Sequence, residues 1–158
     1  MKQESKTRTE SKHQKRRHVR LDIFSPVGFH VLIIDQDMRI RSHPDKKAGI
    51  LLNLSGGGAL ISSTDQVEAD TLLLMRFDIK GLERISDVLG KVKRVEACDD
   101  GEMLIGVEFL TPDQIEDPRL AEGLSRLAGD PLAFTDSLKR LVSRFVFQRQ
   151  IDAEMDTK

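Results

Sequence analysis

The feature that most constrains the fold is a series of short segments, between residues 19 and 110, in which apolar and polar residues alternate. Alternation with a period of two is the pattern of a strand with one buried face. Residues 30–34 and 38–42 flank Asp35-Gln36-Asp37 as a predicted hairpin, and Asp99-Asp100-Gly101 is a second hairpin signal. The other predicted strands cover residues 19–23, 48–54, 72–79, 88–97 and 103–110, with a further strand starting at 59–61. Because no strand–helix–strand alternation occurs, the pattern predicts an antiparallel sandwich or barrel.

The apolar period changes after residue 112. Asp117-Pro118 and Asp130-Pro131 each place a helix-capping residue before a proline, the preferred first residue of a helix. The second of these helices has one apolar face, made of Phe134, Leu138, Leu141, Val142, Phe145 and Val146. We expect this face to cover the barrel; a dimer surface or a partner-docking site stays open for part of it. The polar tail from Asp152 is expected to fray.

Length and composition limit the class of protein. The 158 residues suit one domain with extensions, and 39% of them are hydrophobic, enough for one compact core. There is no apolar run of transmembrane length and no secretory signal, and Cys98 is the single cysteine, so we expect a cytoplasmic protein without disulfides. We divide the chain into a flexible basic arm (1–15), a β-barrel (16–112) and a C-terminal helical extension (113–158).

Charge is unevenly distributed along the chain. The net charge is −1, yet the first 20 residues carry +6. A basic tail on an acidic body is typical of a protein with an anionic partner, although a solvated, disordered tail explains the charge equally well.

Two local motifs point to a more specific function. Arg16-Arg17-His18-Val19-Arg20 has an R-x-x-x-R spacing, and Asn53-Leu54-Ser55-Gly56-Gly57-Gly58 fits the pattern [D/N]-x-S-x-x-G. Each is weak alone, because basic clusters are common and Asn, Ser and Gly populate ordinary turns. In this order, within a run of short strands, the two motifs resemble the PilZ domain family, whose members bind cyclic di-GMP. Residues 90–95 and 106–109 are similar to the later barrel strands of that family.

The resemblance implies a mainly β fold: a six-stranded antiparallel PilZ-type barrel with a C-terminal α-helix. It also implies a receptor that binds cyclic di-GMP between the arm and the turn, without another cofactor or a metal. The implied ligand-binding residues are Arg16, Arg17, Arg20, Asn53, Ser55, Gly57 and Gly58. The receptor would signal to an unidentified partner protein by a conformational change. Motility, exopolysaccharide output and attachment are processes that the family serves, and a homodimer stays open.

The chemistry of these residues suits such a ligand. A guanidinium is a planar fork of donors that matches phosphate oxygens and the O6/N7 edge of guanine. The amide of Asn53 can meet the polar edge of guanine, and Ser55 can bond either ligand or backbone. Gly58 is expected where φ is positive, or where the ligand approaches closer than a Cβ allows.

Three other functions fit the residues less well than a cyclic di-GMP receptor. Four scattered histidines, a lone cysteine and the absence of a nucleophile elbow or P-loop argue against an enzyme or a metal site. A barrel that binds single-stranded nucleic acid needs aromatic stacking platforms, whereas aromatics are 4% of this chain and Trp and Tyr are absent. An adaptor that has the barrel and ignores the nucleotide would not need both intact motifs.

Overall fold

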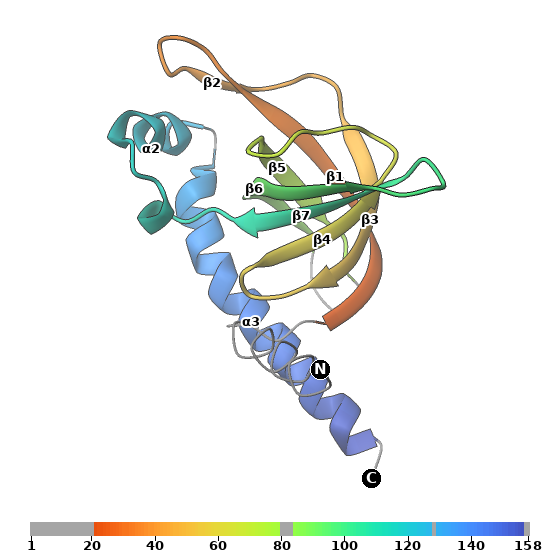
Figure 1. Cartoon of the computed structure of the whole chain (residues 1–158). Coiled ribbons are helices and arrows are strands. Elements are labelled where there is room, and N and C mark those ends of the chain that lie inside the picture. The colour runs from red at the N-terminus through yellow and green to blue at the C-terminus, as the bar shows by residue number, and fades with distance from the viewer. Residues whose placement is uncertain (1–20, 80–83, 128, 157–158) are drawn as a thin grey trace, which may run out of the picture.

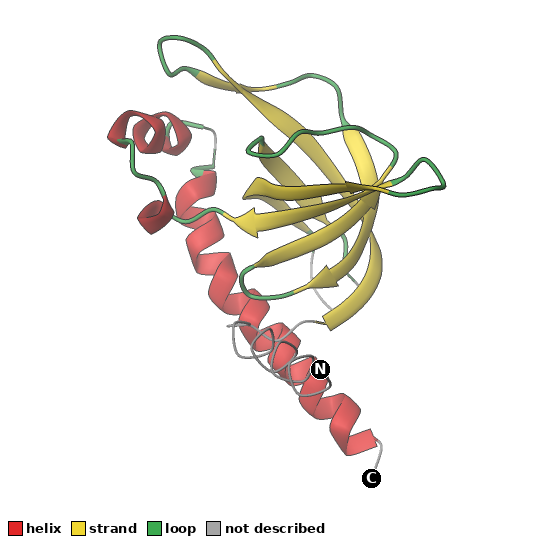
Figure 2. Ribbon diagram, viewed as in Figure 1, coloured by secondary structure: helices red, strands yellow, loops and turns green. Residues whose placement is uncertain are grey.

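The computed structural model describes residues 21–79, 84–127 and 129–156. Strands dominate the first two thirds of the chain and helices the last third (Figures 1 and 2). The strands are β1 (Leu21–Ile34), β2 (Ile40–Ser42), β3 (Lys47–Leu54), β4 (Gly58–Ser63), β5 (Leu72–Phe77), β6 (Ile85–Ala97) and β7 (Met103–Phe109). A 3-10 helix η1 (Pro112–Gln114) and the helices α2 (Pro118–Ser125) and α3 (Pro131–Asp156) follow. Among these residues, no helix combines the length and the apolar character that a membrane crossing requires.

Six strands form a closed antiparallel barrel, as the sequence analysis predicts. Their order is β1-β3-β4-β7-β6-β5, and β1 pairs again with β5 to close the ring. β2 pairs with the C-terminal end of β1, outside the ring. The two strands form the predicted hairpin around residues 35–37. The predicted turn at Gly101 is also present: its φ is 84°, and the N–H of Cys98 donates to the carbonyl of Glu102 at 2.8 Å.

The first strand differs from its prediction. The sequence suggests two separate strands, at 19–23 and 30–34, whereas β1 runs without interruption through 14 residues. Residues 21–29 pair with β3, with a bulge between Asp22 and Ser25 where Phe24 has a φ of 64°. Beyond the bulge, residues 27–31 pair with β5. One bent strand therefore pairs with two neighbours, β3 and β5. Residues 19 and 20 of the predicted strand lie outside the described residues.

α3 covers the barrel, as expected. Leu138, Val142 and Val146 are buried in the same core as the inward side chains of the strands, while Arg140 and Arg144 face solvent. The hydroxyl of Thr135, fully buried on α3, accepts a 2.8 Å hydrogen bond from the N–H of Leu89 on β6. This bond anchors the helix to a barrel strand.

The helical extension departs from prediction at its far end. The chain remains helical to Asp156, where the sequence analysis expects fraying from Asp152. The C-terminal part of α3 extends beyond the strands (Figure 1). α2 begins at Pro118 with Asp117 as its N-cap, whose carboxylate accepts from the N–H of Arg119 at 2.9 Å, as predicted.

Candidate functional site

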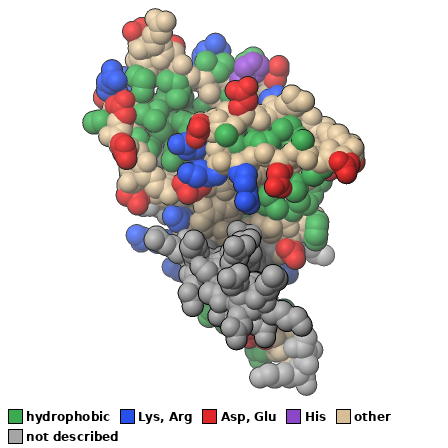
Figure 3. All heavy atoms as spheres, viewed as in Figure 1, with side chains coloured by type: hydrophobic (Ala, Val, Ile, Leu, Met, Phe, Trp, Pro, Cys, Tyr) green, Lys and Arg blue, Asp and Glu red, His purple; other side chains and the backbone are tan. Residues whose placement is uncertain are grey.

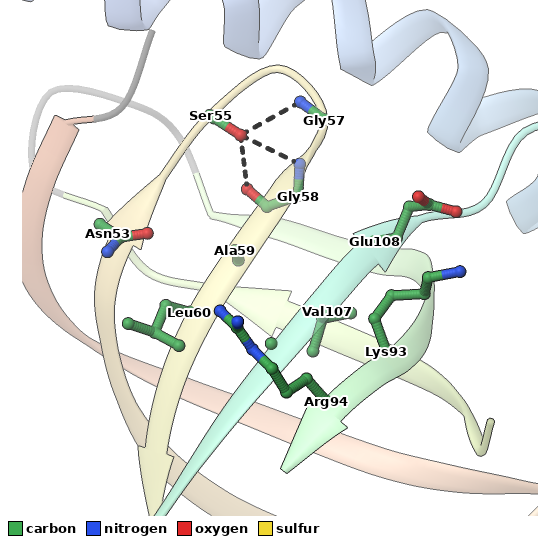
Figure 4. Close-up of a pocket in the computed structure, with 11 residues that line it drawn as sticks. Asn53, Ser55, Gly57, Gly58, Ala59, Leu60, Lys93, Arg94, Val107 and Glu108 are labelled. Atoms are coloured by element: carbon green, nitrogen blue, oxygen red, sulfur yellow. Dashed lines mark hydrogen bonds between the residues drawn. The ribbon is translucent and has the colours of Figure 1, made fainter. Parts of the chain in front are cut away.

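The turn between β3 and β4 is held together by the side chain of Ser55. The Oγ of Ser55 accepts hydrogen bonds from the N–H groups of Gly57 and Gly58, each at 3.2 Å (Figure 4). The backbone N–H of Ser55 donates to the carbonyl of Gly58 at 2.9 Å, which closes the turn. A short hydroxyl side chain is suited to this role because it reaches the backbone two and three residues ahead. Of the two roles left open for Ser55, the structure displays the backbone role.

Gly57 and Gly58 join the turn to β7. The N–H of Phe109 donates to the carbonyl of Gly57 at 2.9 Å. At Gly58, an added Cβ would lie 2.0 Å from the carbonyl oxygen of Val107, so no larger residue fits. The expectation of a positive φ there is wrong, because the described glycines with positive φ are Gly101 and Gly129. The close approach that requires glycine comes from the backbone of β7.

A pocket of about 440 Å³ lies on the outer face of the barrel beside this turn. Its volume falls in the range of small-molecule sites. Four strands and the turn line it: Asn53, Ser55, Gly57, Gly58, Ala59, Leu60, Lys93, Arg94, Gly106, Val107 and Glu108. All four of the turn residues assigned from sequence, namely Asn53, Ser55, Gly57 and Gly58, therefore line one pocket (Figure 4).

Strand register explains how the two sides of the pocket face each other. Asn53 on β3 pairs with Leu60 on β4, Leu60 pairs with Gly106 on β7, and Gly106 pairs with Arg94 on β6. These four residues form one row across four adjacent strands, which we call the cross-strand row. With neighbouring strands about 4.8 Å apart, the row spans roughly 14 Å along the sheet. An amide thus stands at one end and a guanidinium at the other.

Lys93 and Arg94 are pocket residues that the sequence analysis did not assign to the site. Val92 pairs with Val107 and Arg94 with Gly106, so Lys93 is the extra residue of a β-bulge. A bulge breaks the period of two and turns neighbouring side chains toward the same side. The sequence signal was two adjacent basic residues in a predicted strand whose alternation is imperfect.

The charge of the pocket is mixed and favours an anion. Lys93 and Arg94 against Glu108 leave one net positive charge among the lining residues. Within the described part of the chain, neither Lys93 nor Arg94 forms a salt bridge. The guanidinium of Arg94 extends over β7 toward Leu60 (Figure 4). In the space-filling view, Lys and Arg side chains in the middle of the visible face border an area of backbone and of side chains that are neither hydrophobic nor charged (Figure 3).

The predicted arginines of the arm, Arg16, Arg17 and Arg20, lie outside the described residues. β1 begins immediately after them, and its first residue, Leu21, pairs with Leu54. The chain therefore enters the barrel next to the turn that lines the pocket. Among the described residues, no group of three or more His, Cys, Asp or Glu side chains is arranged to hold a metal ion.

Comparisons with known proteins agree with this architecture. Two solved structures share the fold over most of this chain. The Bacillus subtilis inhibitor of motility MotI/DgrA has a TM-score of 0.54 and 14% identity, with 88% of this chain covered. YcgR from Escherichia coli, solved in complex with c-di-GMP, has a TM-score of 0.55 and 12% identity, with 90% of this chain covered. The alignments cover 53% and 49% of those chains, so this chain spans about half their length.

No curated protein matches the sequence. A family model does match it: the model described as the PilZ domain covers residues 14–126. That range includes both motifs, every strand of the barrel and η1, and it ends just after α2. The chain therefore belongs to the PilZ domain family.

Proposed function

We propose that this protein is a receptor for cyclic di-GMP, which it binds in the pocket on the outer face of the barrel. The observation that carries the proposal is the cross-strand row, which places Asn53 and Arg94 at opposite ends of one groove beside the Ser55 turn. The protein belongs to the PilZ domain family. It shares its fold with YcgR, which was solved in complex with c-di-GMP.

The lining chemistry matches the two kinds of group on this ligand. Cyclic di-GMP carries two phosphates and two guanines. Arg94 and Lys93 supply donors and positive charge for a phosphate, and a guanidinium can also bond the O6/N7 edge of guanine. The amide of Asn53 has both a donor and an acceptor for the polar edge of a base. Because the hydrogen bonds of Ser55 already hold the turn, its backbone is ordered before the ligand arrives, which lowers the entropic cost of binding.

The arm is the second half of the proposed site. Leu21, which follows Arg20 in the sequence, pairs with Leu54 between Asn53 and Ser55. This connection supports a contribution of Arg16 and Arg20 to the ligand, with Arg17 in an electrostatic role. In this proposal, the ligand draws the arm onto the barrel, and a partner protein recognises the altered surface. The protein then acts as a cytoplasmic effector without catalysis of its own.

Calorimetric titration of cyclic di-GMP into the full chain tests the proposal. A hydrogen bond to a charged group contributes about 1.5–3 kcal/mol, so Arg94→Ala should weaken binding by roughly tenfold to a hundredfold. Arg16→Ala and Arg20→Ala should weaken it similarly. Arg76→Ala is the matched control, because Arg76 is an exposed arginine on β5, outside the pocket.

The titration also separates this proposal from nucleic-acid binding. GMP and single-stranded DNA, added as competitors, should displace the dinucleotide poorly. The proposal fails if the parent protein does not bind cyclic di-GMP, or if Arg94→Ala and the arm variants bind as tightly as Arg76→Ala.

A further inference from the structure

Gly106 occupies an unusual position in the pocket. It lies in the middle of β7, within the cross-strand row, between Leu60 and Arg94. A glycine inside a strand weakens it, because the backbone loses more entropy on folding and there is no side chain to pack. Such a residue is typically kept for a structural reason or for close approach by another molecule.

Two other strand glycines of the barrel, Gly58 and Gly90, have a clear structural reason. An added Cβ at Gly58 would lie 2.0 Å from the carbonyl oxygen of Val107. At Gly90 it would lie 2.4 Å from a methyl group of Val107 and 2.6 Å from the terminal methyl of Met75. These contacts are shorter than atoms tolerate, so packing alone requires glycine at both positions.

Gly106 differs from these glycines. The nearest atoms to an added Cβ are the Cβ and the carbonyl oxygen of Arg94, both at 3.8 Å, an ordinary van der Waals contact. Its φ also lies outside the left-handed region that favours glycine. Neither packing nor backbone conformation therefore explains why residue 106 is a glycine. Gly106 is one of the residues that line the pocket.

We infer that Gly106 keeps the floor of the pocket flat so that one guanine of cyclic di-GMP can lie against the sheet. This inference rests on the proposed function and specifies the site further. The base would cover the backbone of β7, with Leu60 on one side and Arg94 on the other. From there its polar edges face the amide of Asn53 and the guanidinium of Arg94. Gly106 thus acts by leaving space, and it positions the base without bonding to it.

The variant Gly106→Ala tests the inference in the full chain. Because the methyl group meets no protein atom closer than 3.8 Å, the ligand-free variant should be at least as stable as the parent in urea unfolding. The same methyl group would hold a base away from the sheet. We therefore expect the Kd for cyclic di-GMP to rise about tenfold, which is the effect of one extra or missing methylene in a binding pocket. Gly106→Leu, which adds a larger side chain in the row, should raise it further.

Gly28→Ala is the matched control. Gly28 is also a strand glycine, on β1, and an added Cβ there meets the flexible end of Lys46 at 3.0 Å, away from the pocket. This variant should bind like the parent. Absence of binding by the parent contradicts the proposed function itself. If the parent binds and Gly106→Ala binds equally well, the flat-floor inference is wrong while the proposed function stands. Clear destabilisation of ligand-free Gly106→Ala would also overturn the inference, since the glycine would then be structural.

Discussion

Removal of the Ser55 hydroxyl should destabilise the ligand-free protein. The Oγ accepts two hydrogen bonds of 3.2 Å from the turn backbone, at the long end of the normal range. Each such bond contributes about 0.5–1.5 kcal/mol net, and the half-buried site lets water replace part of the loss. We therefore expect Ser55→Ala to lower the free energy of unfolding by about 1–2 kcal/mol.

Urea unfolding without ligand measures this loss. Far-ultraviolet circular dichroism is the suitable signal, because the chain has no Trp or Tyr. With an m value of about 2 kcal/mol/M, the midpoint should fall by roughly 0.5–1 M. Ser42→Ala, an exposed serine on β2, is the control and should leave the midpoint nearly unchanged. The reasoning is refuted if Ser55→Ala keeps the parent midpoint while losing affinity for cyclic di-GMP, because the hydroxyl would then act on the ligand and not on the turn.

Three further predictions concern stability, pH and salt. Thr135→Val leaves the N–H of Leu89 without its buried acceptor and should cost about 1–3 kcal/mol in chemical denaturation; an unchanged midpoint would mean that water or another group replaces the hydroxyl. Hydrogen bonds from Arg119 hold the pKa of Asp117 below the ordinary value of 3.8; the bond from its backbone N–H has the larger effect and the bond from its side chain the smaller. A carboxyl with a lowered pKa stabilises the fold above its ordinary pKa, and this contribution disappears as the pH falls through the folded value. Asp117→Ala should therefore lower the Tm at neutral pH, and its difference from the parent should shrink below about pH 4; a constant difference would argue against the carboxylate as the cause. Affinity for cyclic di-GMP should drop as sodium chloride rises from about 50 to 500 mM, because salt screens exposed charges such as Lys93 and Arg94. A Kd independent of salt would exclude an electrostatic contribution.

Local sequence patterns predict most of the elements. β5 illustrates why: Leu73, Met75 and Phe77 alternate with more exposed residues, and burial follows that alternation. Asp117 and Pro118 mark the start of α2 by capping chemistry that acts within a few residues. Closure of the barrel has no such local signal. It depends on β1 pairing with both β3 and β5, and the bulge that bends β1 interrupts the alternation that would have revealed one long strand.

Part of the pocket lining was predictable from the sequence. The motif located Asn53, Ser55, Gly57 and Gly58 at one pocket, because the residues of a turn stay together in any fold. It did not predict that Gly58 is required by the neighbouring strand, since that contact depends on β7. Lys93 and Arg94 escaped assignment for the same reason. They reach the pocket through strand register and a bulge, which only the assembled barrel defines.

The most direct test of the proposed site is a map of backbone amide shifts by nuclear magnetic resonance during titration with cyclic di-GMP. The account predicts that the largest shifts cluster on residues 53–60, on Lys93 and Arg94, and on residues 104–108, together with the arm. A second cavity, between the β1–β2 hairpin and α2, provides an internal comparison, and its residues should shift little. Shifts concentrated at that cavity, or the absence of any shift at saturating ligand, would contradict the account.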